Sequence, residues 1–267
     1  MSFLQGQLSN DMRRLEANRS VFAAFSSPQG RVLALMHLMA HSGGIVAILP
    51  RDLVAPTLDA LRKYVLRSKL HIEDGGESLI IAGAYGTPPP DGIGVYPVNR
   101  DARRFWAIGT ADSVSERVPA GALRHTDLFQ QEWRLADIRS GLPQIYLPTR
   151  GAFVAQMLNL DLLDGISFSK GCYTGQEIIA RTQHLGRIKR RLYRLRLPPG
   201  EWRIGQPLRL VDGRTGRLIE VVGSGDACEA LAVLGVDARS ADVNSGADDA
   251  AAGAAVAAAI LPLPYDP

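Results

Sequence analysis

The chain has 267 residues, 46% hydrophobic and 21% charged, a composition that excludes a disordered or fibrous protein. Because the formal net charge is only +3, any attraction to nucleic acid or an anionic surface must come from local basic clusters. The two cysteines lie far apart without CxxC spacing, and no signal-like start or uninterrupted apolar run of about 18 residues is present, so we expect a cytoplasmic protein without a membrane partner.

The first 88 residues predict strands followed by a helix. From Val21 to Leu49, apolar runs alternate with the turn sequences SSPQG and HSGG, which is typical of an antiparallel meander. After Pro50, apolar residues recur at helical spacing, and this pattern predicts a helix that ends near Ser68. The segments LHIED and SLIIAG flank two glycines and predict a hairpin, and TPPPDG at 87–92 predicts a loop between subdomains.

A second round of strands and helix follows. GVYPV and RRFWAIG predict strands, and residues 126–139 predict a helix that stops at Gly141 and Pro143. Strands followed by a helix, twice over, indicate the α+β class, with subdomains at about 1–88 and 89–190. From residue 191 to 267, short strand-like segments broken by turns predict a small β-barrel or sandwich, and the Ala-rich residues 238–259 within it predict a long loop or one mobile helix.

Cys172 lies in the stretch SFSKGCYTGQEIIART, residues 167–182. Thr174 and Glu177 stand three residues apart before two isoleucines, which predicts a capping box and a helix that runs from Thr174 to near Gly186. Cys172 would then lie close to the positive end of the helix dipole and to the ammonium of Lys170, and both favour the thiolate.

Glycines on both sides of this cysteine, Gly171 and Gly175, leave room for a ligand or a second backbone. The competing interpretation is that Cys172 is a small, inert core residue, which is the commoner fate of a free cysteine. Cys228, next to a predicted strand, is interpreted as structural.

A basic run follows the motif. No acidic residue occurs between Ile178 and Gly200, while seven basic residues do: Arg181, Arg187, Lys189, Arg190, Arg191, Arg194 and Arg196. Such a run can neutralise the phosphates of RNA or a polyglutamate tail without conferring sequence specificity. It can equally be a solvated face, and the alternation of Arg194 and Arg196 with apolar residues favours that interpretation for these two.

With these residues assembled, the chain resembles the YgfZ family, folate-binding proteins related to the T-protein (aminomethyltransferase) of the glycine cleavage system. The most specific element is KGCYTGQE at 170–177, which matches the family signature without substitution. Further similarity lies in FLQGQLSND at 3–11, PQGRV at 28–32, and the W-x4-I-x2-G-x-P pattern from Trp133 to Pro143. The resemblance therefore extends over nearly the whole chain.

The resemblance implies a GcvT-like folate-binding fold, with α+β subdomains in residues 1–190 around a central cleft and a C-terminal β-barrel in residues 191–267. It implies tetrahydrofolate as cofactor and a role in assembly or repair of iron–sulfur clusters in client enzymes, including enzymes that modify tRNA. Cys172 is the implied functional thiol, with Lys170 beside it, and Trp133 the implied folate contact. The other implied cofactor-binding residues are Gly171, Tyr173, Gly175, Gln176, Glu177 and Arg181.

Two physical arguments limit what we expect for the folate contact and for a metal site. A pterin ring needs an aromatic or apolar wall, which Trp133 could provide, although its helical neighbours make a core position the default interpretation. One cysteine cannot hold a conventional cluster, which takes about four protein ligands, so we expect no resident metal site.

Two other functions stay open at this stage: a tetrahydrofolate-dependent aminomethyl transferase and an RNA-binding module that uses residues 181–196. The T-protein carries a catalytic aspartate after a V-x-N-A stretch, and the corresponding region here reads AILPRDLVAPT. This departure argues against a classical aminomethyltransferase.

Overall fold

The computed structural model describes residues 1–16, 19–66, 68–76, 78–85, 94–99, 101–115, 127–184, 186–237 and 254–267. The chain begins with α1 (Ser2–Gln5) and the 3-10 turn η1 (Met12–Arg14). The predicted meander is confirmed, because β1 (Ser20–Ser26), β2 (Val32–His41) and β3 (Gly44–Ile48) form an antiparallel sheet in that order. The helix that follows, α2 (Arg51–Arg62), packs on β2 and ends six residues before the predicted end at Ser68.

The second sheet corrects one prediction. Its order is β4-β6-β5, from β4 (Ile80–Tyr85), β5 (Gly94–Val98) and β6 (Asp101–Gly109), and α3 (Ala111–Ser115) follows it. The predicted LHIED/SLIIAG hairpin is wrong, because β4 pairs with β6 while Asp74 pairs with Arg51 at 2.9 Å. The TPPPDG loop lies outside the described residues. A subdomain boundary near residue 88 would fall between β4 and β5, two strands of this one sheet.

A long helix, α4 (Asp127–Ser140), agrees with the prediction and stops at Gly141, whose φ of +66° suits glycine. Two 3-10 turns, η2 (Leu147–Thr149) and η3 (Ala155–Leu158), then lead to the motif and to α5 (Gln176–His184). No helix in the described ranges is long and apolar enough to cross a membrane.

The C-terminal strands form one antiparallel sheet in the order β11-β7-β10-β9-β8. They are β7 (Arg190–Leu197), β8 (Pro207–Arg209), β9 (Thr215–Ser224), β10 (Ala227–Gly235) and β11 (Ala259–Leu261). The closed barrel is not confirmed: between the edge strands, the described residues show one bridge, Leu210 with Val256. Most of the Ala-rich segment lies outside the described residues, and β11, which the sequence did not predict, begins at its end.

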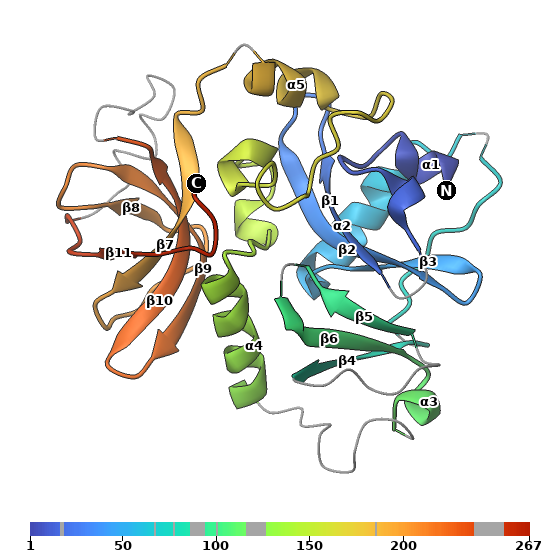
Figure 1. The fold of residues 1–267 in the computed structure, drawn as a ribbon, viewed down its shortest axis with the longest axis horizontal. Coiled ribbons are helices and arrows are strands. Elements are labelled where there is room, and N and C mark those ends of the chain that lie inside the picture. The colour runs from blue at the N-terminus through green and yellow to red at the C-terminus, as the bar shows by residue number, and fades with distance from the viewer. Residues whose placement is uncertain are drawn as a thin grey trace.

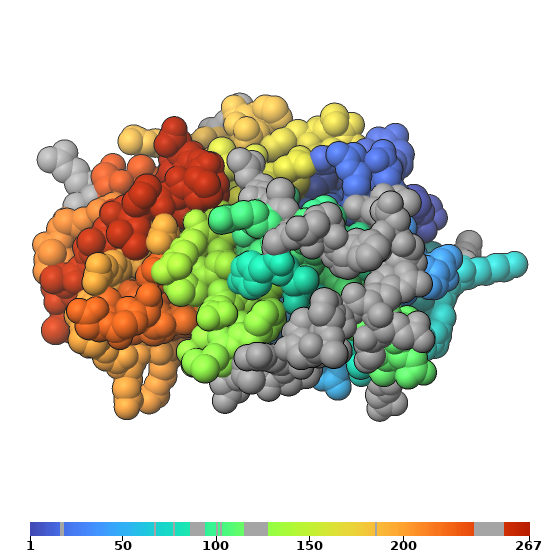
Figure 2. All heavy atoms as spheres, turned by 60° about the horizontal axis from the view of Figure 1, so that its bottom comes forward, coloured from blue at the N-terminus to red at the C-terminus, as the bar shows by residue number. Residues whose placement is uncertain are grey.

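Helix α4 lies between the C-terminal sheet and the two N-terminal sheets (Figure 1). Arg134 pairs with Glu220 of β9, and Arg139 pairs with Glu229 of β10 at 2.7 Å, so two acids of the sheet hold the helix. The chain end returns to the same helix, because Tyr265 Oη donates to the carbonyl of Gly141 at 2.6 Å. Figure 2 shows α4, in yellow-green, at the surface beside the orange and red C-terminal strands.

One hydrophobic core connects these parts. It includes residues of the first sheet, such as Phe25, and residues of the C-terminal strands, such as Leu192 and Leu231. A second, smaller core lies within the C-terminal sheet and includes Cys228, in agreement with its structural interpretation.

Candidate functional site

The motif lies on an exposed loop between η3 and α5, at the top of the molecule in Figure 1. Cys172 and Gly171 are exposed, whereas Lys170 and Tyr173 on either side are buried. A Cβ added to Gly171 would meet nothing within 4 Å, so its surroundings are open. The loop therefore presents the thiol to solvent from a buried frame, and the interpretation of Cys172 as a core residue is wrong.

The frame comes from the N-terminal segment. Lys170 Nζ donates to the carbonyl oxygens of Leu8 and Asn10 at 2.8 and 2.7 Å. Further bonds between the two segments include Ser167 N to Ser9 O at 2.9 Å, Thr174 N to Gly6 O at 3.2 Å, and Thr174 Oγ1 to Gln7 Oε1 at 3.0 Å. FLQGQLSND and KGCYTGQE, far apart in the chain, are thus one structural unit.

The PQGRV turn completes this unit. A Cβ on Gly30 would lie 2.8 Å from Cβ of Ile178, and one on Gly175 would lie 2.6 Å from the carbonyl oxygen of Ser27. Both glycines also have positive φ, +71° and +82°, so backbone conformation and close approach both require glycine here. Together, residues 3–11, 27–31 and 164–178 are called the motif cluster below.

The predicted capping box is wrong. Helix α5 begins at Gln176, two residues after the expected start, and the Thr174 hydroxyl is turned to Gln7. Gln176 Oε1 accepts instead from Tyr173 N at 3.2 Å. The helix also ends at His184, two residues before Gly186. Cys172 therefore lies four residues before the first helical residue, rather than two residues before a capping threonine.

Lys170 has a structural position. Its Nζ also lies 5.1 Å from the ring centre of Tyr173. Burial lowers the pKa of Lys170 to about 8 and raises the pKa of Tyr173 to about 12. The ammonium of Lys170 therefore interacts with two main-chain carbonyls and the Tyr173 ring, and these contacts hold the loop in place. Glu177 and Arg181 of the signature form an exposed i,i+4 pair at 3.2 Å on the first turns of α5.

Trp133 lies in a different cluster, on α4. Its ring centre is 5.6 Å from that of Tyr85, 6.2 Å from Phe129 and 6.3 Å from Trp106. Trp106 lies in turn 4.4 Å from His37, which stacks on Phe22 at 4.6 Å. These six residues are called the aromatic cluster below, and its rings extend from β1 and β2 through β6 to α4.

Two features fix the indole of Trp133. Arg104, fully buried, lies 4.8 Å from its ring centre and donates to Asp101 and Asp137, each at 2.7 Å. A Cβ on Gly83 would lie 2.6 Å from the same ring, so glycine is needed for the indole to approach β4. Tyr85 is 46% exposed and Trp133 is half-buried, so the cluster offers a partly open aromatic wall.

His37 is the buried polar member of the aromatic cluster. Burial, together with the charge of Arg104, lowers its pKa to about 3, so the ring is neutral at pH 7. Its Nδ1 has no hydrogen-bond partner. The described residues contain no group of three or more His, Cys, Asp or Glu side chains able to hold a metal ion.

The structure does not bring Trp133 and Cys172 into contact with shared neighbours. Trp133 contacts residues of α4, β4 and β6, whereas the loop of Cys172 is bonded to the N-terminal segment and the β1–β2 turn. The sequence had grouped them as one cleft. It had also missed Tyr85, Gly83 and Arg104, since no sequence signal joins them to Trp133.

The basic run contains arginines that are paired with acids and arginines that are exposed. Arg191 binds Asp161 through two bonds of 2.6 and 2.8 Å, and Arg194 binds Glu229 at 2.6 Å. The strand pattern had suggested that Arg194 points outward to solvent. Its side chain instead pairs with an acid. Arg181, Arg187 and Arg196 are exposed. Since two of its arginines are neutralised within the fold, the run presents less positive charge than its sequence indicates.

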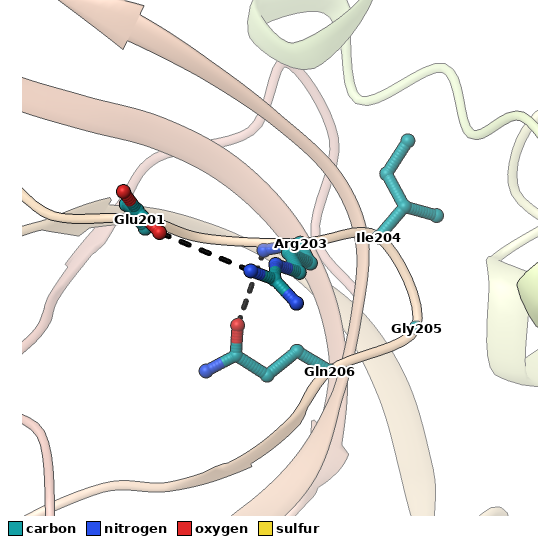
Figure 3. Close-up of a pocket in the computed structure, with 5 residues that line it drawn as sticks. All are labelled: Glu201, Arg203, Ile204, Gly205 and Gln206. Carbon is teal, nitrogen blue, oxygen red and sulfur yellow. Dashed lines mark hydrogen bonds and ion pairs between the residues drawn. The ribbon is translucent and has the colours of Figure 1, made fainter.

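One open hollow, of about 480 Å³, lies away from both clusters. Figure 3 shows its lining, Glu201, Arg203, Ile204, Gly205 and Gln206, on a single turn of the chain before β8. Arg203 N donates to Gln206 Oε1 at 3.1 Å, and the Arg203 and Glu201 side chains are almost fully exposed. All the lining residues of this hollow come from one solvent-exposed turn. It therefore lacks the enclosed, mostly apolar lining that is typical of a ligand site.

The chain is similar to proteins named tRNA-modifying protein YgfZ. With that of Yersinia pestis (strain Pestoides F) it shares 30% identity over 295 residues, which cover 99% of this chain and 87% of the relative. With that of Hamiltonella defensa it shares 30% identity over 245 residues, covering 83% of this chain and 69% of the relative.

A solved structure gives an independent comparison. The glycine cleavage system aminomethyltransferase T from Bartonella henselae matches with a TM-score of 0.60 at 13% identity, covering 88% of this chain and 73% of that one. At this identity the match shows a shared fold. No family model matches the chain.

Proposed function

The chain belongs to the YgfZ family, and from this membership we propose that it binds a folate and supports assembly or repair of iron–sulfur clusters in selected enzymes, including tRNA-modifying enzymes. In this proposal Cys172 is the functional thiol, Lys170 positions its loop, and tetrahydrofolate is the bound cofactor. The observation that carries the proposal is the exposed thiol held in a buried frame by three segments of the chain.

The motif cluster supports a role for the thiol beyond packing. An exposed cysteine contributes little to a core, yet the loop that carries it is fixed by a buried ammonium and by two glycines without space for a side chain. Such positioning brings a reactive group to a fixed place at the surface. The open space around Gly171 suits the approach of a client protein to the Cys172 sulfur.

The aromatic cluster supports folate binding. A flat heteroaromatic ring needs an apolar wall, and Trp133 and Tyr85 together provide one that is partly exposed. Asp137, bonded to Arg104 beside this wall, adds a polar group. The residues present therefore fit a pterin. The signature residues Gly171, Tyr173, Gly175, Gln176, Glu177 and Arg181 are proposed to shape the cysteine loop and α5 rather than to contact the pterin.

Neither competing function is favoured. In the region of the T-protein's catalytic aspartate, Asp52 Oδ2 accepts from Leu147 N at 2.8 Å, a bond that joins α2 to η2. For an RNA-binding module, Arg191 and Arg194 are already paired with acids. Exposed Arg181 and Arg187 still leave room for an anionic partner such as RNA or polyglutamate.

Complementation tests the role of the thiol. In a strain that lacks the corresponding gene, wild type and Cys228→Ala are expected to restore tRNA thiolation and iron–sulfur enzyme activities, whereas Cys172→Ala is not. Cys228→Ala is the matched control because its thiol is buried in the C-terminal core. Full restoration by Cys172→Ala would remove the thiol from the proposal.

A titration tests the folate separately. Tetrahydrofolate is expected to quench tryptophan fluorescence in wild type and to lose most of this effect in Trp133→Phe. Trp202→Phe is the control, because Trp202 packs against the core of the C-terminal sheet and its Nε1 donates to Pro198 O at 2.9 Å. Equal quenching in wild type and Trp133→Phe would place the folate elsewhere.

A further inference from the structure

Strand β7 begins with two arginines, Arg190 and Arg191, and carries two more, Arg194 and Arg196, and their surroundings differ. Arg191 and Arg194 each face a carboxylate, Asp161 and Glu229. Arg190 is only 6% exposed, so it is as deeply buried as either of them. Among the described residues, its buried Nη2 finds no hydrogen-bond partner, and none of them forms an ion pair with its guanidinium.

The strand register explains why no acid of the sheet neutralises Arg190. The residue opposite it on β10 is Gly235, which has no side chain. The next residue on the same face of β7 is Leu192, and Val233 lies opposite that leucine. These two positions of β10 are therefore apolar or without a side chain. On the other face of β7, Asp161 is paired with Arg191 through two bonds.

Burial of this unpaired charge has an energetic consequence. A guanidinium stays protonated in proteins, so it cannot escape desolvation by losing its charge. An ion buried without a partner is strongly destabilising, and a native fold keeps one where something else neutralises it. The planar fork of arginine matches the two oxygens of a carboxylate or phosphate group.

We propose that Arg190, at the start of β7, binds an oxyanion, the phosphate or carboxylate group of a small ligand. The strand beside it is held in place, because Arg191 Nη1 donates to Gln156 O at 3.0 Å and Gln156 Nε2 donates to Ile179 O of α5 at 2.7 Å. Exposed Arg187, three residues earlier, adds positive charge to the approach. The inference does not depend on the roles proposed for Cys172 and Trp133, since Arg190 belongs to neither the motif cluster nor the aromatic cluster.

Thermal unfolding with added anion tests the site. Inorganic phosphate at about 100 times its dissociation constant stabilises the native state about 100-fold and is expected to raise the Tm of wild type by about 5 °C, relative to sodium chloride of equal ionic strength. Sodium acetate in a parallel titration tests the carboxylate. The stronger of the two responses identifies the class of oxyanion.

Three variants assign the response to one side chain. Arg190→Met removes the charge at similar volume, so the anion response is expected to disappear, while Tm without the anion is unchanged or higher. Arg190→Lys keeps the charge without the fork and is expected to respond more weakly. Arg196→Met is the matched control, because Arg196 is the exposed arginine of the same strand, and it is expected to keep the full response.

The outcomes are separable. If the wild type responds to neither anion, or if Arg190→Met keeps the response, the proposal is wrong. Isothermal titration calorimetry of wild type with phosphate and acetate is a second measurement: if neither anion binds, the proposal is overturned even where Arg190→Met folds poorly. Loss of folate binding or of complementation would leave this result unchanged, because neither is measured here.

Discussion

The motif cluster and the aromatic cluster hold their central residues by opposite means. Around Cys172 the contacts are mostly polar and involve main-chain groups, above all the Lys170 bonds to the Leu8 and Asn10 carbonyls. Around Trp133 they are ring against ring, with one cationic contact from Arg104. Directional bonds fix a loop in one place, whereas packed rings provide surface. The first arrangement suits a positioned reactive atom and the second a flat ligand.

Replacement of Lys170 by Met is expected to have the largest effect. Two charge-assisted hydrogen bonds disappear and two carbonyls in a buried setting lose their donor, so the free energy of unfolding should fall by about 3 kcal/mol. Urea unfolding of wild type and the Lys170→Met variant measures this change in the free energy of unfolding. Arg181→Met, which removes an exposed pair, is the control and should change it by less than about 0.5 kcal/mol. Equal stability of the two variants would contradict the polar frame.

Acid should weaken the aromatic cluster through His37. The folded state holds the pKa of His37 at about 3, well below that of the unfolded chain, so the unfolded state binds more protons below about pH 6.5. Stability is therefore lost as pH falls from about 6.5 toward 3, by up to about 1.4 kcal/mol per pH unit from this group. Urea unfolding of wild type and His37→Leu at pH 8 to 5 measures it. A constant difference between the two proteins over this range would rule out buried neutral histidine as the cause.

A pair of glycine replacements compares the two clusters directly. Gly83→Ala places a Cβ 2.6 Å from the Trp133 ring and should lower the free energy of unfolding by about 2 kcal/mol, with a change in tryptophan fluorescence. Gly171→Ala meets nothing within 4 Å and should be neutral or stabilise slightly. If Gly171→Ala were the more harmful of the two, the space around Cys172 would not be open.

The smallest effect on stability is expected for Cys172→Ala, below about 0.5 kcal/mol, because the side chain is exposed. In contrast, native wild-type protein should be alkylated by iodoacetamide at Cys172 first, and at Cys228 after unfolding in urea. Peptide mass spectrometry after timed quenching measures both rates. Equal rates at the two sites in the native protein would contradict the exposed loop.

Hydrophobic periodicity correctly predicted the elements that depend on local sequence pattern. It failed for the elements that depend on long-range pairing. The meander of β1 to β3 and the helix α4 follow from alternation and helical spacing, and both are confirmed. The hairpin prediction failed because β4 finds its partner in β6, more than fifteen residues later, and no local signal encodes that choice. The capping box failed because a distant residue, Gln7, competes for the Thr174 hydroxyl.

The candidate site follows the same rule. The signature around Cys172 was visible in the sequence, and so was the FLQGQLSND segment, but not the bonds between them, which cross about 160 positions. The clustering of arginines was visible as well, yet their partners Asp161 and Glu229 come from other elements. The sequence thus identifies charged and reactive side chains, but it does not reveal the long-range contacts that already occupy them in the fold.

The bond from Tyr265 to the end of α4 has a consequence for biosynthesis. The carbonyl of Gly141 receives its partner only after the ribosome has made more than a hundred further residues, since the donor is the hydroxyl of Tyr265. The bonds from Lys170 to the N-terminal segment likewise wait for the middle of the chain. Both ends of the described chain are therefore secured late, and a nascent chain that stalls before residue 265 exposes the end of α4 to chaperones and proteases.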